Sequence, residues 1–193
     1  MDKETWINTL NRSYSPLSIE CQKELEEAVI IRVLKKGSIL VHEGQYSDKS
    51  FFIVEGCARA YYLKDGKDIS DWFAFENEFI SSIISFFTKE ASPHYIELLE
   101  DCILLELSRE SIDYLADKYH DFERLIRMVI TKTMLSQQQR IVSIQFQKAE
   151  ERYANILATF PAITQRIPLT HIASYLGVTL ETLSRIRNPR KRI

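Results

Sequence analysis

Long apolar runs are absent from this 193-residue chain. No segment approaches the ~20 consecutive apolar residues that a membrane-spanning helix needs. The first residues, Met1, Asp2 and Lys3, begin a charged segment that lacks the apolar centre of a signal peptide. The sequence therefore predicts no membrane association. A length of 193 residues suits one large domain or two small ones.

Cysteine and histidine are both scarce. The three cysteines are odd in number and far apart, which argues against a disulfide framework and against an iron–sulfur cluster, since such a cluster needs four grouped thiolates. Free thiols are typical of a reducing cytoplasm. No phosphate loop, nucleophile elbow or metal-spaced cluster occurs. The three cysteines and four histidines of the chain are Cys21, Cys57, Cys102, His42, His94, His120 and His171. We therefore expect neither an enzyme nor a bound metal or cofactor.

Glycine is also rare and unevenly placed. Four of the five glycines fall between residues 37 and 66, and the fifth is Gly177. Short β-branched and aromatic segments lie between and after the first four, and Asp65-Gly66 is a strong hairpin signal. The predicted strands are 30–34, 38–41, 50–55, 58–64, 67–74, 95–100 and 102–108. Seven short strands with this turn spacing predict an antiparallel sandwich or barrel, with a short helix between residues 79 and 87.

Helical periodicity occurs on both sides of this β unit. Residues 5–28 form two predicted helices separated by Pro16, and residues 121–145 form one long helix free of Gly and Pro. So long an apolar stripe needs a partner, which is either the β unit or the same helix of a second subunit. We favour the homodimer. The expected interface residues are Phe122, Ile126, Val129, Ile130, Thr133 and Ile141.

The last thirty residues differ in charge from the rest. Residues 164–193 carry six basic side chains and one acidic one, a net +5, whereas the remainder carries −7. A basic end on an acidic body is typical of binding to a polyanion such as nucleic acid. The alternative is a solvated charged tail.

Within this basic end, residues 167–187 have the pattern of a helix-turn-helix. A first helix over 169–176 ends at Gly177, Thr179 is a good N-cap for a second helix, and Glu181 suits its first turn. One face of the second helix carries polar and basic side chains that can hydrogen-bond base edges and phosphates in a major groove. An ordinary αα-hairpin is the alternative.

The whole order of elements resembles the cyclic-AMP receptor protein/FNR (Crp/Fnr) family of bacterial transcription regulators. The resemblance is carried by 36–44 (KGSILVHEG), by 52–56 (FIVEG) with Arg59, by Phe79-Ile80 and by the helix-turn-helix. It implies an α+β fold with an N-terminal cyclic-nucleotide-binding-like β-roll (jelly-roll). The implied domains are 1–120 for the N-terminal helices and β-roll, 121–145 for the dimerisation helix, and 146–193 for a helix-turn-helix domain.

The sequence departs from family members that bind cyclic AMP at the nucleotide site. Their Gly-Glu and Arg-Ser pairs align with Ser81-Ser82 and Ser92-Pro93, so the arginine that would neutralise the cyclic phosphate is missing. We expect no cyclic-nucleotide binding of the usual kind. Either an unknown small-molecule effector enters the cavity, or the roll is a scaffold and RNA-polymerase contact surface. The expected effector-pocket residues are Ser81, Ser82, Ser92, Tyr95, Gln137 and Gln138.

The second departure is at the C-terminus. The family usually continues into a β-hairpin wing, whereas this sequence has a truncated wing, the basic stub formed by Arg190, Lys191 and Arg192. The resemblance places Glu181 and Arg185 at base-reading positions, with Leu180 replacing a common arginine. The other expected DNA contacts are Thr179, Thr182, Ser184, Arg187 and the basic stub of Arg190, Lys191 and Arg192.

We therefore predict a homodimer that binds double-stranded DNA at two half-sites. The rival is a small-molecule or protein-partner sensing β-roll module that does not bind DNA. The basic end favours the DNA-binding regulator, because a sensing module that does not bind DNA would not need it.

Overall fold

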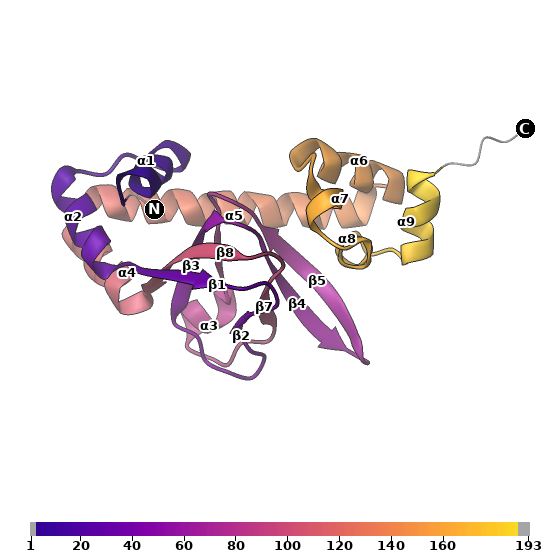
Figure 1. The fold of residues 1–193 in the computed structure, drawn as a ribbon, viewed down its shortest axis with the longest axis horizontal. Helices are drawn as coiled ribbons and strands as arrows, with labels where there is room; N and C mark the ends of the chain where they lie inside the picture. Colours follow the sequence, from indigo (N-terminus) through magenta and orange to yellow (C-terminus); the bar gives the residue numbers. More distant parts are fainter. Residues whose placement is uncertain (1–2, 189–193) are drawn as a thin grey trace, which may run out of the picture.

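The structure is a computed structural model, and it describes residues 3–188. Two N-terminal helices lead into a β-roll, which is followed by a long helix and a group of small helices at the far end (Figure 1). The helices are α1 (Lys3–Ser13), α2 (Ile19–Ala28), α3 (Ile83–Thr88), α4 (Arg109–Lys118), α5 (His120–Phe146), α6 (Ala149–Thr159), α7 (Ile163–Arg166), α8 (Leu169–Tyr175) and α9 (Leu180–Arg187).

The β-roll consists of two four-stranded antiparallel sheets, ordered β1-β8-β3-β6 and β2-β7-β4-β5. The strands are β1 (Ile30–Leu34), β2 (Ile39–Val41), β3 (Lys49–Glu55), β4 (Ala58–Lys64), β5 (Lys67–Ala74), β6 (Phe79–Ser81), β7 (Tyr95–Leu98) and β8 (Cys102–Ser108). Asp65 and Gly66 both have positive φ and close the β4–β5 hairpin, as the sequence predicts.

One strand was not expected. Residues 79–81 pair antiparallel with β3 through Ser50–Ser81 and Phe52–Phe79, whereas the sequence predicts a short helix and no strand between residues 79 and 87. The helix α3 begins only at Ile83. Three residues are too few to show the period-two alternation of a strand, so the pairing with β3 decides the structure here.

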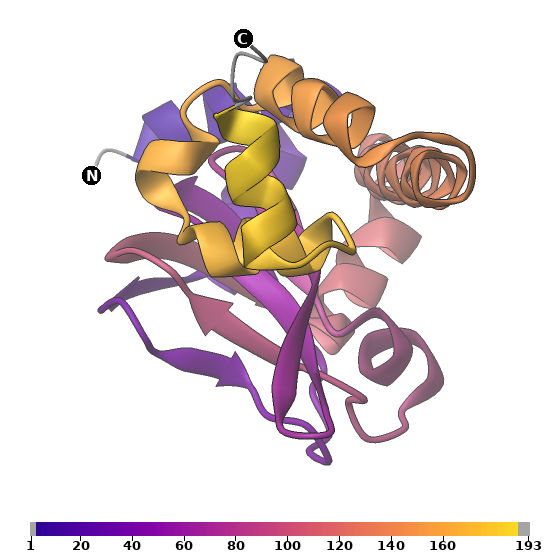
Figure 2. The ribbon, with the colours of Figure 1, turned by 90° about the vertical axis from the view of Figure 1, so that its right-hand side faces the viewer.

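The central strands β3 and β8 of the first sheet are mostly buried on both faces, in keeping with their nearly continuous apolar runs, whereas the edge strand β1 is largely exposed. Ile53 and Leu104 point into the roll, where they pack in the interior core. Phe52 and Leu105 point the other way and pack with α1, α2, α4 and the start of α5. The view along α5 shows the helices gathered against one side of the roll (Figure 2).

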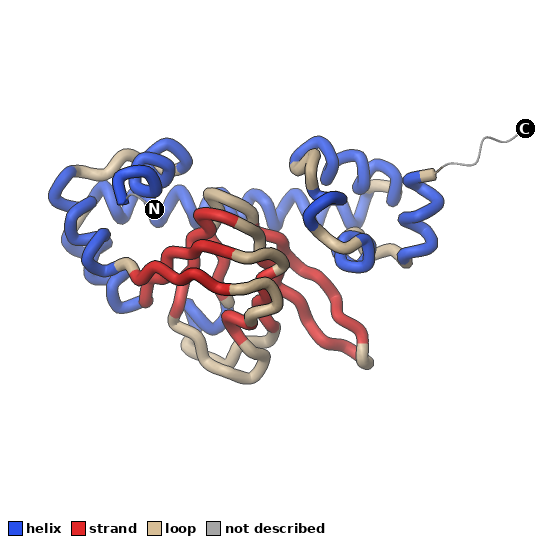
Figure 3. The backbone as a smooth tube through the Cα atoms, in the orientation of Figure 1, coloured by secondary structure: helices blue, strands red, loops and turns tan. Residues whose placement is uncertain are grey.

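The helix α5 contains 27 residues, so it is about 40 Å long at 1.5 Å per residue. It runs along the roll and reaches the small helices beyond it (Figure 3). A third apolar cluster joins the roll to the small helices, because Phe73 and Phe75 of the roll pack with Ile163, Ile167 and Ile172. The small helices are therefore docked on the roll through a shared core.

Candidate nucleic-acid interface

The helix-turn-helix forms as the sequence predicts. Gly177 has φ +67°, a conformation that favours glycine, and it turns the chain between α8 and α9. The Thr179 hydroxyl accepts a hydrogen bond from the Thr182 backbone amide at 3.1 Å and so caps α9. Ile172 and Leu183 are fully buried between the two helices.

The outer face of α9 is open to solvent. The exposed side chains on this face are Thr179, Leu180, Glu181, Ser184, Arg185 and Arg187, and Thr182 is half-buried. Glu181 and Arg185 are four residues apart, so they lie side by side on one face of the helix. Within residues 3–188, no hydrogen bond or ion pair occupies the guanidinium groups of Arg185 and Arg187, which leaves these groups free to bind DNA. Arg190, Lys191 and Arg192 lie outside the described residues.

The helix α8 faces the roll. The buried side chain of Arg59 on β4, only 3% exposed, forms ion pairs with Asp68 and Glu97 at 2.9 Å and approaches Nδ1 of His171 at 2.8 Å. Arginine only donates hydrogen bonds, so Nδ1 of His171 accepts and the imidazole is neutral. Burial, followed by the Arg59 charge, lowers the pKa of His171. Ser174 adds a further link, because its hydroxyl accepts from the Ser70 amide at 2.9 Å.

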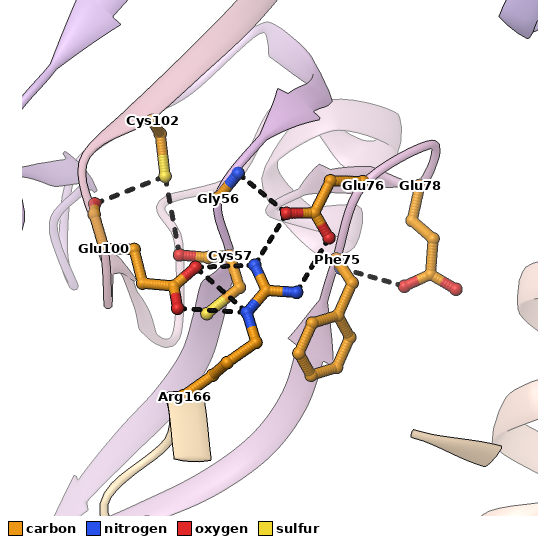
Figure 4. Close-up of polar contacts among 8 residues, drawn as sticks. All are labelled: Gly56, Cys57, Phe75, Glu76, Glu78, Glu100, Cys102 and Arg166. Atoms are coloured by element: carbon orange, nitrogen blue, oxygen red, sulfur yellow. Dashed lines mark hydrogen bonds and ion pairs between the residues drawn. The ribbon is translucent and has the colours of Figure 1, made fainter. Parts of the chain in front are cut away.

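Arg166 at the end of α7 also faces the roll (Figure 4). Its guanidinium lies between Glu76 and Glu100, with nitrogen–oxygen distances of 2.6 Å to each carboxylate. Burial favours a higher pKa for Glu76, but the hydrogen bonds from Arg166 and from nearby amides outweigh it and lower the pKa. Arg166, one of the six basic residues at the C-terminal end, is therefore engaged by the chain's own carboxylates.

The residues expected at an effector pocket do not form one site. Ser82 and Ser92 are buried at 0% and 2% exposure. The Ser82 hydroxyl donates to that of Ser92 at 2.8 Å, and Ser92 in turn donates to the His94 carbonyl at 2.7 Å. Tyr95 instead stacks on Tyr61. Both hydroxyl protons are thus engaged within the chain.

Ser81 and Gln137 line a different, mostly apolar cavity of about 360 Å³, bounded by α3, α4, α5 and the first sheet. Gln138 instead lines a second cleft, between α5 and α6, which Gln137 also borders.

His94 was not expected to be significant, yet it is 6% exposed and neither ring nitrogen has a hydrogen-bond partner within residues 3–188. Burial lowers the pKa of His94.

The expected dimer interface needs a correction at Phe122. This side chain is 1% exposed and packs in the chain's own core with α1 and α2, so it offers no surface to a partner. Ile126 and Val129 are half-buried against the same core. Ile130 and Ile141 are 46% and 49% exposed. Helical spacing identifies apolar stripes on α5, but it does not tell which stripe the N-terminal helices cover.

The exposed apolar side chains of α5 form a seam that the sequence analysis recognised only in part. Ile130, Met134, Gln137, Ile141 and Ile144 are spaced by four, three, four and three residues, and all but Gln137 are more than 45% exposed. This spacing is that of the a and d positions of a coiled coil, in which a polar residue often fixes the register.

The comparisons with known proteins agree with this architecture. Residues 31–119 match the family model of the cyclic nucleotide-binding domain. The transcriptional activator protein Anr of Pseudomonas protegens is 27% identical over 183 residues, which cover 88% of this chain and 74% of that protein. The structure of FixK2 from Bradyrhizobium japonicum aligns with a TM-score of 0.72 at 18% identity, over 83% of each chain.

A regulator of the Crp/Fnr family from Eubacterium rectale aligns with a TM-score of 0.65 at 19% identity, over 88% of this chain and 82% of that one. The roll, the long helix and the terminal helix-turn-helix thus have the arrangement of proteins that act as transcription regulators, which supports a DNA-binding regulator. Residues 31–119 have the family pattern of a cyclic nucleotide-binding domain, and most of the chain is similar to regulators of the Crp/Fnr family. Within residues 3–188, no helix is long and apolar enough to cross a membrane.

Proposed function

We propose that this protein is a homodimeric transcription regulator that reads two half-sites of an operator through the major groove. The observation that carries the proposal is the open face of α9, where Glu181 and Arg185 lie exposed while the rest of the helix-turn-helix is packed against the roll. Glutamate accepts from the amino group of cytosine, and arginine donates two hydrogen bonds to guanine. The expected half-sites lie about one helical turn, ~34 Å, apart.

The first test separates base reading from phosphate binding. Duplexes selected by the wild-type protein from a random pool define its site. Arg185→Ala is expected to weaken binding by roughly 1–3 kcal/mol and to relax the preference at one base pair per half-site. Arg187→Ala, the matched control at the end of the same helix, is expected to weaken all sequences evenly and to reduce the salt dependence of binding. If the two variants behave alike in repeat selections, the base-reading role of Arg185 is wrong.

We also propose that DNA binding does not depend on a cyclic nucleotide. The phosphate-binding arginine is replaced by Ser92, whose hydroxyl is engaged within the chain. An anion buried without a positively charged partner is strongly disfavoured. An effector of another kind has the 360 Å³ cavity beside Ser81 and Gln137 available to it.

Thermal unfolding with and without cyclic AMP tests this second point. A ligand present at 100 times its dissociation constant stabilises a protein by about 2.7 kcal/mol. We expect no shift in Tm at millimolar cyclic AMP. The selected duplex, added to the same protein preparation, serves as the positive control and is expected to raise Tm. A saturable rise with cyclic AMP contradicts the proposal.

A further inference from the structure

We propose that Arg166 is a positioning residue for DNA binding: by clamping Glu76 and Glu100 of the roll, it sets the orientation of the helix-turn-helix and thereby the separation of the two half-sites that a dimer accepts. The inference rests on the proposed function. It gives Arg166 a role other than the DNA contact that its place in the basic end suggests.

The contact geometry is that of a clamp rather than of a single surface ion pair. Arg166 Nη1 and Nη2 donate to the two oxygens of Glu76 at 2.8 and 2.6 Å, while Nε and Nη2 donate to Glu100 at 3.0 and 2.6 Å. The Gly56 amide also donates to Glu76 at 2.9 Å and orients this carboxylate (Figure 4). Fork-shaped arginine contacts of this kind fix direction as well as distance.

Other contacts hold the same two parts together. The guanidinium carbon of Arg166 lies 5.3 Å from the centre of the Phe75 ring, and Phe75 stacks on Phe160 of the segment after α6. On the other side, Arg140 of α5 donates to the carbonyls of Asp71 and Tyr175, which links α5, β5 and α8. Docking is thus fixed at several points around a shared apolar core.

The docked arrangement leaves the recognition face open. Glu181, Ser184 and Arg185 are exposed while Arg166 is clamped, so the clamp does not cover the groups expected to read bases. The covalent connection to α5 is short, through Gln147 and Lys148, both of which have extended backbone conformations. Without docking, the helix-turn-helix would be free to rotate about this joint. A clamp that fixes the rotation favours binding to two half-sites at one spacing, because bivalent binding requires matched geometry.

Removing the negative charges of Glu76 and Glu100 distinguishes a positioning role of Arg166 from a phosphate contact, because the two roles predict opposite changes in DNA affinity. Glu76→Gln/Glu100→Gln removes two negative charges near the DNA-binding unit and leaves Arg166 in place. Simple electrostatics predicts tighter DNA binding by this variant. The positioning role predicts weaker binding to a two-half-site duplex. The glutamine amides at positions 76 and 100 would not hold the Arg166 guanidinium as firmly as the two carboxylates do.

The experiment compares affinities for three kinds of duplex: the selected site, the same site with one or two base pairs inserted between the half-sites, and a single half-site. For Glu76→Gln/Glu100→Gln we expect about tenfold weaker binding to the selected site, a smaller penalty for the insertions, and unchanged affinity for the single half-site. Arg166→Lys, which keeps the charge but loses the fork, is expected to change binding in the same direction. The matched control, Glu43→Gln/Glu90→Gln, removes two exposed charges elsewhere on the roll and is expected to keep the wild-type spacing preference.

Unchanged or tighter binding by Glu76→Gln/Glu100→Gln, with the spacing preference intact, would overturn the proposal. So would an equal loss by Arg166→Lys on the single half-site and on the full site, since that result indicates a direct DNA contact. The single half-site measurement also reports whether the helix-turn-helix of each variant is folded. If the wild-type protein selects no sequence at all, the proposed function itself is wrong, an outcome distinct from a clamp that has no effect on spacing.

Discussion

Met134→Glu/Ile141→Glu is expected to convert the protein from a dimer to a monomer. Both side chains belong to the α5 seam and are 60% and 49% exposed in the single chain. Burying one such side chain fully contributes about 1.5–3 kcal/mol, and two chains each bury the seam in a symmetric dimer. Glutamates at these positions would place four carboxylates in an apolar contact, so we expect the dissociation constant to rise by at least ~100-fold.

Light scattering during size-exclusion chromatography measures this change directly. The wild-type protein is expected at close to twice the chain mass of 22.6 kDa, and the double variant at the chain mass itself. Gln139→Glu adds a charge to an exposed position off the seam and is expected to remain dimeric. A monomeric wild type, or a double variant that still elutes as a dimer, would show that the seam is not the interface. The monomeric double variant is also expected to bind the two-half-site duplex more weakly than the wild-type dimer does.

Local signals in the sequence were sufficient for the helix-turn-helix and for the β4–β5 hairpin. Gly177, Thr179 and the Asp65-Gly66 pair each require or favour one backbone conformation, and the structure has that conformation at each of them. These features depend on a few neighbouring residues. The caps at Ser18 and Ser108 depend on equally local contacts, because each serine hydroxyl accepts from a backbone amide in the first turn of the helix that follows it.

Features that depend on distant residues were not predictable in the same way. The carboxylates that clamp Arg166 lie 90 and 66 positions earlier in the chain, on segments that meet only when the roll closes. The charge count of residues 164–193 therefore included Arg166 in the basic end, although its guanidinium is paired with carboxylates of the roll. The burial of Phe122 was not predictable for the same reason, since the packing of α1 and α2 determines which side of α5 is covered.

The residues expected at the effector pocket lie apart from one another for a third reason. Alignment to a family motif places Ser81, Ser82 and Ser92 near one another in the chain topology, but side chains alternate between the two faces of a strand. Ser82 and Ser92 are buried and bond to each other, whereas Ser81 borders the cavity against α5. Consecutive residues that the motif treats as a pair, the last residue of β6 and the N-cap of α3, thus lie in different surroundings.

Gly56→Ala is expected to be the most damaging small substitution in the roll. Gly56 joins β3 to β4 with φ +97°, and a Cβ there would lie 2.5 Å from Cys102 Sγ and 2.7 Å from the Asp101 carbonyl oxygen. Overpacking and backbone strain each cost roughly 1–3 kcal/mol, so we expect a loss of about 3–5 kcal/mol in the free energy of unfolding. Chemical denaturation with urea, followed by circular dichroism, measures this loss.

Gly44→Ala is the matched control, because Gly44 has a similar φ of +80° but no atom within 4 Å of the added Cβ. Its expected cost is strain alone, about 1–2 kcal/mol. The difference between the two variants therefore isolates the close approach of the β3–β4 connection to β8. Since the Gly56 amide also orients Glu76, a folded Gly56→Ala protein is expected to lose spacing preference on DNA as well, whereas Gly44→Ala is not. Equal destabilisation by the two substitutions would mean that strain, and not packing against Cys102, makes glycine necessary at position 56.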